Sequence, residues 1–314
     1  MSDTGRILSL HLAVLAALLG LHFVAPPYHH ANLARVMVLA VYAMGYNIAF
    51  GYTGLLSLGH ALFFAAGLYG TGLTIQLAGW PAGPALITGL LAGAAVAGGL
   101  GLLALRTAGV SFMIVTLMFA QAGYLTILYF TGYTRGEEGF VLPAAARSIG
   151  GLDPTGEAAR YLLALALFAV ALAVNLGLVR SGLGRVMVAI RENEERSRML
   201  GYDPFRVKLA ALAISGLYAG AAGAAWGWLF GYVGAGFATI QYSILPLLYV
   251  LLGGAGTVLG PFLGALAMFY LIDIASGLTD AYLMVVGVAL VVLVLFAPKG
   301  ILGSLRERWL RWLP

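Results

Sequence analysis

The amino-acid sequence predicts an all-α membrane protein that crosses the bilayer about ten times. Of its 314 residues, 61% are hydrophobic and only 9% are charged, a balance typical of a chain that lies mostly in lipid. Apolar stretches near the roughly 20 residues that a helix needs to span a bilayer recur along the whole chain. No segment has the composition of a soluble domain. We therefore expect one transmembrane domain over residues 1–314.

The first apolar segment follows Arg6 and has the general form of a cleaved signal peptide. Its apolar run is longer than the usual signal core of about 7 to 15 residues, and no A-x-A site precedes Pro26 and Pro27. We expect a retained first span. Hydropathy and turn signals together place ten spans, with edges good to about 2 to 4 residues. The spans are Ile7–Val24, Val36–Phe50, Leu58–Leu77, Ala85–Leu105, Val110–Phe130, Tyr161–Val179, Val207–Phe230, Ser243–Leu252, Phe262–Leu278 and Ala281–Ala297.

Two of these spans, the second and the eighth, are shorter than a bilayer requires. Short helices interrupted by glycine are tolerated at membrane depth only when protein surrounds them or when they line a polar cavity. The sequence therefore predicts broken helices in these two places. Both point to a translocation path.

The distribution of basic residues predicts the orientation. An even number of spans puts both termini on one side, and cytoplasmic loops carry an excess of Lys and Arg. With both termini inside, four basic residues lie outside, namely Arg35, Arg135, Arg147 and Arg160. The other 13 of the 17 lie inside: Arg6, Arg106, seven in residues 180–208, Lys299, Arg306, Arg308 and Arg311. We expect an N-in, C-in topology.

One polar segment interrupts the apolar chain, and it reads RSGLGRVMVAIRENEERSRMLGYDPFRVK. It contains Arg180, Arg185, Arg191, Arg196, Arg198, Arg206 and Lys208. Good helix formers run from Gly184 to Leu200 and stop at Gly201, and Asp203 with Pro204 is typical of the cap and first turn of the next helix. We expect a cytoplasmic helix in the loop 180–206. It either anchors to lipid headgroups or docks a cytoplasmic partner.

Two glycine-rich motifs stand far apart in the chain, GYTGLLSLGHALFFAAGLYG from Gly51 and GGAGTVLGPFLGA from Gly253. Glycine permits sharp backbone turns and close approach of helices. Packing alone would account for these glycines. Because Thr53, Ser57 and His60 accompany the first motif, we favour a polar-lined path.

Isolated polar residues inside spans are costly in lipid and usually face the interior of a bundle. Each either lines the path or bonds one helix to another. His60 by itself makes no metal site. Because the core offers almost no groups for both charges of a zwitterion, we expect passage without a tight intramembrane site. The isolated residues are Asn47, Gln76, Gln121, Asn175 and Asp273.

Several functional classes are excluded by residues that the sequence lacks. The chain has no Cys, so it has no disulfides, no Cys-based metal site and no thiol catalysis. It contains no HExxH, no P-loop and no supported GxSxG. We expect a chain that is not an enzyme, needs no cofactor and relies on ATP hydrolysis elsewhere. The net charge of +5 reflects cytoplasmic loops, and no nucleic-acid partner is expected.

The ordered motifs resemble a known family. They comprise AIRENE from Ala189, Leu200-Gly201, Lys208-Leu209, AGAAGA from Ala219, the two glycine motifs and LFAPKGILG from Leu295. Together they are similar to the permease subunits of branched-chain amino-acid ABC transporters, and among these to the M-type subunit. The likeness extends from about Met37 to the C-terminal region.

This resemblance implies a multi-pass subunit of the bacterial inner membrane, in contact with lipid. Its partners would be an H-type permease, two cytoplasmic ATPase subunits and a periplasmic solute-binding protein. We assign ATPase coupling to Ala189, Ile190, Arg191, Glu192, Asn193, Glu194 and Glu195. We assign the translocation path to Asn47, Gly51, Thr53, Gly54, Ser57, His60, Gln121, Gly253, Gly254 and Gly256.

The loop at residues 131–160 is the one substantial external loop. Its TGYTRGEEGFVLP departs from the family pattern at Tyr133 and at the two glutamates, which leaves the solute open between branched-chain or related amino acids and urea, short amides or another small polar solute. We expect the loop either to be merely solvated or to dock the binding protein. The docking residues would be Arg135, Glu137, Glu138 and Arg147.

Two other classes of membrane protein remain as alternatives. An ion-coupled secondary transporter would carry intramembrane carboxylates, and Asp273 is the only carboxylate well inside a predicted span. A channel or structural protein would need neither coupling ions nor an ATPase. The ABC permease interpretation accounts for more of the sequence than either.

Overall fold

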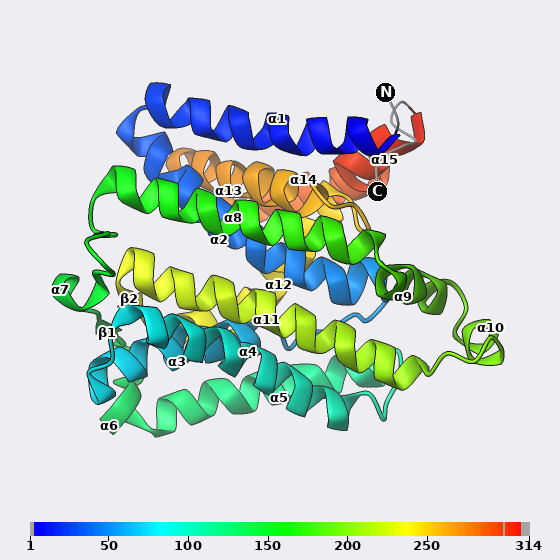
Figure 1. Cartoon of the computed structure of the whole chain (residues 1–314), viewed down its shortest axis with the longest axis horizontal. Helices are drawn as coiled ribbons and strands as arrows, with labels where there is room; N and C mark the ends of the chain where they lie inside the picture. The colour runs from blue at the N-terminus through cyan, green and yellow to red at the C-terminus, as the bar shows by residue number, and fades with distance from the viewer. Residues whose placement is uncertain (1–2, 298, 309–314) are drawn as a thin grey trace.

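The computed structural model describes residues 3–297 and 299–308. Long helices run side by side along one axis and form a bundle (Figure 1). In the described part, the only strands form a two-stranded antiparallel sheet, β1 (Phe140–Val141) with β2 (Tyr232–Val233). The protein is therefore an all-α polytopic membrane protein, as predicted.

The long helices follow the predicted order of spans. They are α1 (Asp3–Val24), α2 (Pro27–Asn47) with the π-helix η1 (Ile48–Tyr52), α3 (His60–Ala78), α4 (Ala82–Ala104), α5 (Val110–Tyr129), α8 (Glu157–Arg180), α11 (Pro204–Phe230), α12 (Ile240–Gly253), α13 (Gly260–Leu278) and α14 (Tyr282–Phe296). Shorter helices lie between and after them. These are α6 (Thr131–Thr134), α7 (Ala144–Arg147), α9 (Gly182–Glu192), α10 (Glu194–Met199), the 3-10 helix η2 (Ala235–Ala238) and α15 (Gly300–Arg308).

Within the described residues, eight helices are long and apolar enough to cross a membrane. The predicted eighth span, α12, is indeed short, with 14 residues and Pro246 inside it. The prediction of a short second span was wrong. Residues Pro27–Tyr52 form one span of 26 residues. Its first turns contain His30 and Asn32, which lower the hydropathy, but both side chains are buried in the protein.

The centre of the bundle is α2 together with a block of three helices, α3, α4 and α11. Nearly every residue of α2 from Val36 onward is buried. The three-helix block packs backbone against backbone: a Cβ added to Gly67 would lie 2.2 Å from the Gly220 carbonyl oxygen, and one added to Gly93 would lie 2.5 Å from the Gly220 Cα. Small residues permit such close approach between membrane helices.

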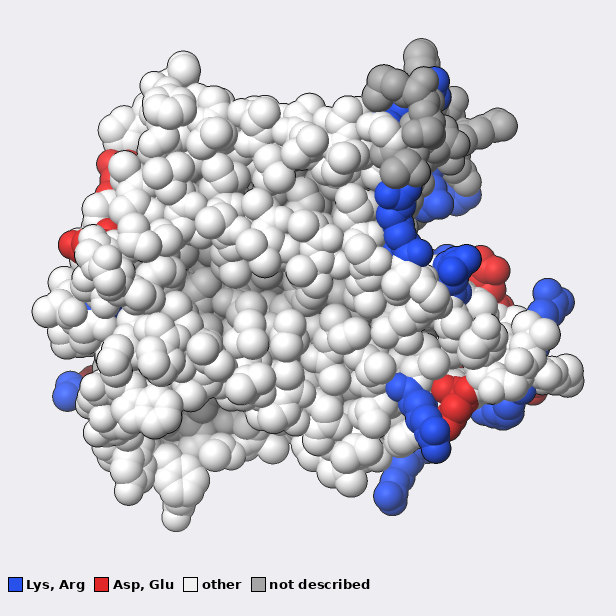
Figure 2. All heavy atoms as spheres, viewed as in Figure 1, with Lys and Arg blue, Asp and Glu red and all other residues white. Residues whose placement is uncertain are grey.

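The two ends of the bundle differ in charge. One end carries α9, α10, α15 and the start of α1, and the other carries α6, β1 and α7 (Figure 1). We call the first the basic end, because most of the Lys and Arg visible in Figure 2 lie there. The apolar face between the ends shows almost no charge. Arg311, one of the predicted inside residues, lies outside the described residues.

Candidate functional site

The polar segment forms two short helices, and not the single helix expected from Gly184 to Leu200. Helix α9 ends where Asn193 adopts an extended backbone, with φ −158° and ψ 103°. The Asn193 side chain then caps α10, because its Oδ1 accepts a hydrogen bond from the Arg196 N–H at 2.8 Å. As expected, Asp203 caps α11, accepting from the N–H groups of Phe205 and Arg206 at 3.0 and 3.3 Å.

Helix α9 lies with its apolar side against the rest of the chain. Ile190 is only 3% exposed, so it packs inside this protein and is not available as an anchor for a partner. Ala189, Arg191, Glu192, Asn193 and Glu195 are exposed, and Glu194 is half-buried. The surface that α9 and α10 offer to a partner is therefore of mixed charge, and the exposed apolar side chains of Met199 and Leu200 lie at the end of α10.

The two glycine motifs meet at the basic end of α2, although about 200 residues separate them in sequence. The link is Asn47, whose Nδ2 donates to the Thr257 carbonyl at 2.9 Å and whose Oδ1 accepts from the Gly256 N–H at 2.9 Å. Gly51 lies at the contact point, and a Cβ there would be 1.9 Å from Asn47 Oδ1 and 2.5 Å from the Gly256 nitrogen. Only glycine fits this approach.

We call this junction the glycine seam, consisting of Gly51, Gly54, Gly254 and Gly256. The side chain of Arg191 lies across it. Its Nη1 donates to the Gly51 carbonyl, and a Cβ on Gly54 would lie 2.9 Å from Arg191 Cγ. Gly54 and Gly256 have φ of 77° and 71°, a backbone conformation that favours glycine. The residues predicted for coupling and those predicted for the path thus meet in one site.

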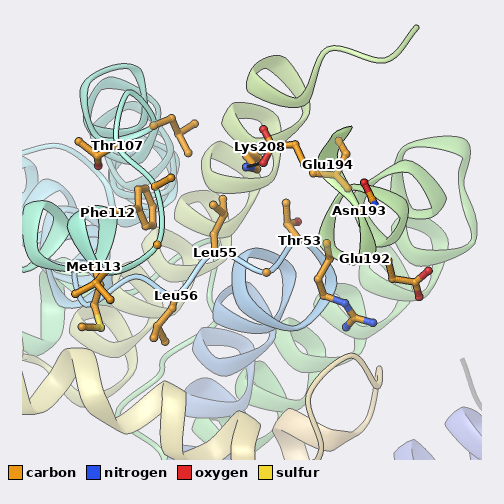
Figure 3. Close-up of a pocket in the computed structure, with 17 residues that line it drawn as sticks. Thr53, Leu55, Leu56, Thr107, Phe112, Met113, Glu192, Asn193, Glu194 and Lys208 are labelled. Atoms are coloured by element: carbon orange, nitrogen blue, oxygen red, sulfur yellow. Dashed lines mark hydrogen bonds and ion pairs between the residues drawn. The ribbon is translucent and has the colours of Figure 1, made fainter. Parts of the chain in front are cut away.

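A cavity of about 540 Å³ opens beside the seam at the basic end. It lies between the loop after η1, the connection from α4 to α5, and the α9 to α10 junction (Figure 3). On one side, Lys208 Nζ pairs with Glu194 Oε2 at 2.5 Å, which ties α10 to the start of α11. Leu55, Phe112 and Met113 give the remaining wall an apolar character.

The start of α3 is held by side-chain hydroxyls from three other helices. His60 Nε2 lies 2.7 Å from Ser215 Oγ of α11, Ser243 Oγ of α12 accepts from the Ala61 N–H at 2.9 Å, and Thr116 Oγ1 of α5 accepts from the Leu58 N–H at 3.1 Å. Sequence reasoning missed Ser215, Ser243 and Thr116. The available signal was a small hydroxyl side chain flanked by apolar residues within a span.

The remaining predicted path residues have different surroundings. Thr53 Oγ1 donates to the Ile48 carbonyl at 2.9 Å, and Ser57 Oγ accepts from the Gly59 N–H at 3.1 Å. A Cβ on Gly253 would lie 1.8 Å from the Gly260 carbonyl oxygen, so Gly253 joins α12 to α13. Gln121 is exposed on α5, apart from the seam.

The other polar residues predicted inside the spans differ in their exposure and in their hydrogen bonds. Asp273 accepts a hydrogen bond from the Tyr28 hydroxyl at 2.5 Å at the exposed edge of the bundle. Gln76 is exposed on α3. Asn175 is fully buried, and neither its amide oxygen nor its amide nitrogen has a hydrogen-bond partner among the described residues.

The predicted external loop places its charged residues unequally. Arg135, Glu137 and Glu138 are exposed. Arg147 is only 9% exposed, and its Nη1 donates to the carbonyls of Trp228 and Leu229 at 3.3 Å each. The Arg147 guanidinium thus caps the C-terminal carbonyls of α11.

The surroundings of Arg147 also act on its charge. Burial lowers the pKa of its guanidinium, the nearby Arg160 charge lowers that pKa further, and Asp153 opposes both effects. Because an arginine stays protonated near neutral pH, the group remains a cation held inside the loop. A docking partner would meet the three exposed residues of the loop and not this one.

Comparisons with known proteins identify a family of transport permeases. The family model described as "Branched-chain amino acid transport system / permease component" matches residues 30–296. The high-affinity branched-chain amino acid transport system permease protein LivM of Escherichia coli (strain K12) is 32% identical over 297 residues, covering 87% of this chain and 69% of the relative. The LivM protein of Salmonella typhimurium is 30% identical over 294 residues, with the same coverage.

A second permease protein of the same transport system is also similar. LivH of Escherichia coli (strain K12) is 25% identical over 287 residues, covering 84% of this chain and 91% of the relative. No solved structure matches the chain.

Proposed function

The chain belongs to the branched-chain amino acid transport permease family, and from this premise we propose that it is the M-type permease subunit of a binding-protein-dependent ABC importer. It would carry branched-chain amino acids across the bacterial inner membrane with ATP hydrolysed by separate subunits. The observation that carries the proposal is the contact of the Arg191 side chain with the glycine seam. It connects the polar surface of α9 directly to backbone turns among the membrane helices.

We propose further that the basic end faces the cytoplasm, with an N-in, C-in topology, ten crossings and one domain over residues 1–314. The excess of Lys and Arg at that end supports this orientation. The start of α1 and helix α15 lie at the same end, as an even number of crossings requires.

The proposed importer contains partners on both sides of the membrane. An H-type permease pairs with this chain, which the likeness to LivH supports, because LivH and LivM are both named as permease proteins of one transport system. Two ATPase subunits bind the cytoplasmic surface of α9 and α10. A periplasmic solute-binding protein meets Arg135, Glu137 and Glu138 at the opposite end.

The coupling mechanism follows from the hydrogen bonds at the seam. When an ATPase displaces α9, Arg191 carries the Gly51 carbonyl with it. Asn47 joins this region of α2 to Gly256 and Thr257, in the turn that precedes α13. The seam therefore links one cytoplasmic movement to two membrane segments, and the turns at Gly54 and Gly256 absorb the change. We assign the translocation path to the region next to the seam.

The test is ATP-dependent uptake of leucine into proteoliposomes that contain the whole importer and its binding protein. The wild-type complex is expected to take up leucine only when ATP is inside and the binding protein outside, and not to take up urea or acetamide. Uptake without ATP, or a preference for an amide, would contradict the proposal.

A matched pair of variants on α9 tests the contact that carries the proposal. Arg191→Gln is expected to lower uptake by at least about tenfold, because a hydrogen bond to a charged group contributes about 1.5 to 3 kcal/mol. The control is Arg185→Gln, an exposed arginine of the same helix, which should transport normally. Equal uptake by both variants would show that Arg191 has no coupling role.

A further inference from the structure

Helix α15 packs against the seam at Gly254. Its contact with the end of α12 is backbone to backbone: a Cβ on Gly300 would lie 2.5 Å from both the Gly254 nitrogen and the Leu251 carbonyl oxygen, and a Cβ on Gly254 would lie 2.7 Å from the Gly303 nitrogen. Gly254 has φ 119° and Gly300 has φ 73°. Such a contact leaves no room for sliding, so α15 and the end of α12 form one rigid support.

Arg306 extends from this support to the seam. Its Nη1 donates to the Gly256 carbonyl at 3.3 Å, while the Gly256 N–H donates to Asn47 Oδ1 at 2.9 Å. Gly256 is therefore bonded through its N–H to α2 and through its carbonyl to α15. A Cβ on Gly256 would also lie 3.1 Å from Arg191 Nη1.

Two arginines from separate helices thus converge on one pair of glycine turns. Both donate to backbone carbonyls, Arg191 to Gly51 and Arg306 to Gly256. Neither forms an ion pair with any side chain that the structure describes. Two like charges brought this close repel each other, and the carbonyls hold them in place.

The helices that carry the two arginines differ in how firmly they are held. Arg191 belongs to α9, whose outer surface is polar and exposed, whereas Arg306 belongs to a helix that is locked to α12 through glycines. If an ATPase moves α9, the Gly51 carbonyl moves with it while Arg306 holds the Gly256 carbonyl still. The relative displacement of the two turns would then appear as movement inside the membrane region.

We infer that Arg306 is a positioning residue for energy coupling: it fixes the Gly256 turn to α15, so that displacement of α9 changes the geometry of the seam and does not shift the seam as a whole. The inference rests on the proposed function. Without Arg306, the Gly256 turn moves together with Asn47 and α9 when α9 is displaced. ATP hydrolysis then continues with little transport.

The test compares two activities of the same whole complex in proteoliposomes, leucine uptake and ATP hydrolysis stimulated by the loaded binding protein. Arg306→Gln is expected to lower the number of leucine molecules carried per ATP about tenfold, the effect of losing a charge-assisted hydrogen bond, with hydrolysis within about twofold of wild type. Arg306→Lys, which keeps the charge and a donor, should restore part of the ratio. Arg106→Gln removes an exposed arginine at the same end and serves as the matched control.

The possible results separate the inference from the proposed function. If uptake and hydrolysis fall in the same proportion in Arg306→Gln, the residue has only a structural role and the inference is overturned. The inference is also overturned if neither leucine uptake nor ATP hydrolysis changes in a folded Arg306→Gln complex. If the wild-type complex shows no ATP-dependent leucine uptake, the proposed function itself fails.

Discussion

Glycine has two different uses in this protein, and the three-helix block and the glycine seam show the contrast. In the block of α3, α4 and α11, Gly67, Gly93 and Gly220 lie inside regular helices and let backbones touch. In the seam, Gly54 and Gly256 lie in turns at positive φ, and polar side chains cross them. The block is close-packed with no room to adjust. The seam is joined by a few side-chain hydrogen bonds, each of which can break and reform.

This contrast indicates where rigidity and movement lie. Close packing distributes its energy over many small contacts and resists deformation, whereas a hydrogen bond contributes only about 0.5 to 1.5 kcal/mol net, or about 1.5 to 3 kcal/mol when one partner is charged. A force applied at α9 would therefore shift the seam before it deforms the block. Substitutions in the two regions should have different consequences.

The largest effect is expected in the block. Gly67→Leu would put a side chain into the backbone of α11, where even a Cβ lies 2.2 Å from the Gly220 oxygen, so the helices must separate. We expect destabilisation of about 3 kcal/mol or more, seen as loss of folded protein in detergent and a lower melting temperature. Gly99→Leu, at a position of α4 with nothing within 4 Å, is the control. If Gly67→Leu folds as stably as this control, the block is not close-packed.

A smaller effect on stability, but a large one on transport, is expected in the seam. Gly54→Leu and Gly256→Leu each force a branched side chain into positive φ, which costs about 1 to 2 kcal/mol, and each displaces Arg191. We expect folded subunits that still bind the ATPase, with leucine uptake lowered about tenfold or more. Co-purification of the ATPase together with an uptake assay measures both. Wild-type uptake by either variant would remove that glycine from the coupling site.

The smallest effect is expected at the end of the bundle far from both regions. Charge reversal of Glu137 and Glu138 to Lys should weaken docking of the solute-binding protein by about 1 kcal/mol, because exposed charges contribute little and are screened by salt. Binding measured at low and high salt should differ less in the variant than in the wild type. The preference for leucine should not change. A changed solute preference would place recognition in this loop.

The sequence predicted the bundle well because long apolar runs have few other stable arrangements. It misjudged the start of α2, since His30 and Asn32 read as polar while the folded protein surrounds them. It also missed the break between α9 and α10, although Asn193 is a residue type that caps helices. At the start of α2 the deciding contacts lie outside the local segment, whereas the Asn193 cap is a local contact with Arg196.

The candidate site was predicted in its parts but not as one assembly. The glycine motifs and the α9 residues each stood out by composition, whereas the hydrogen bonds of Asn47 cross about 200 residues of sequence. Arg147 was predicted as a surface charge because nothing near it in sequence reveals the carbonyls of Trp228 and Leu229. Local patterns identify residue types, and the fold determines which of them meet.

The π-helix η1 gives the end of α2 an adjustable length. A turn of π-helix holds about one residue more than a turn of α-helix, and η1 lies directly between Asn47 and the loop that begins at Thr53. Converting that turn to α-helix would release one residue of chain and rotate the following backbone by about 100°. The π-helical turn thus holds one residue of additional chain inside the membrane. Releasing it would allow Gly51 to move by about one residue rise, about 1.5 Å. The rest of α2 would stay fixed in the bundle.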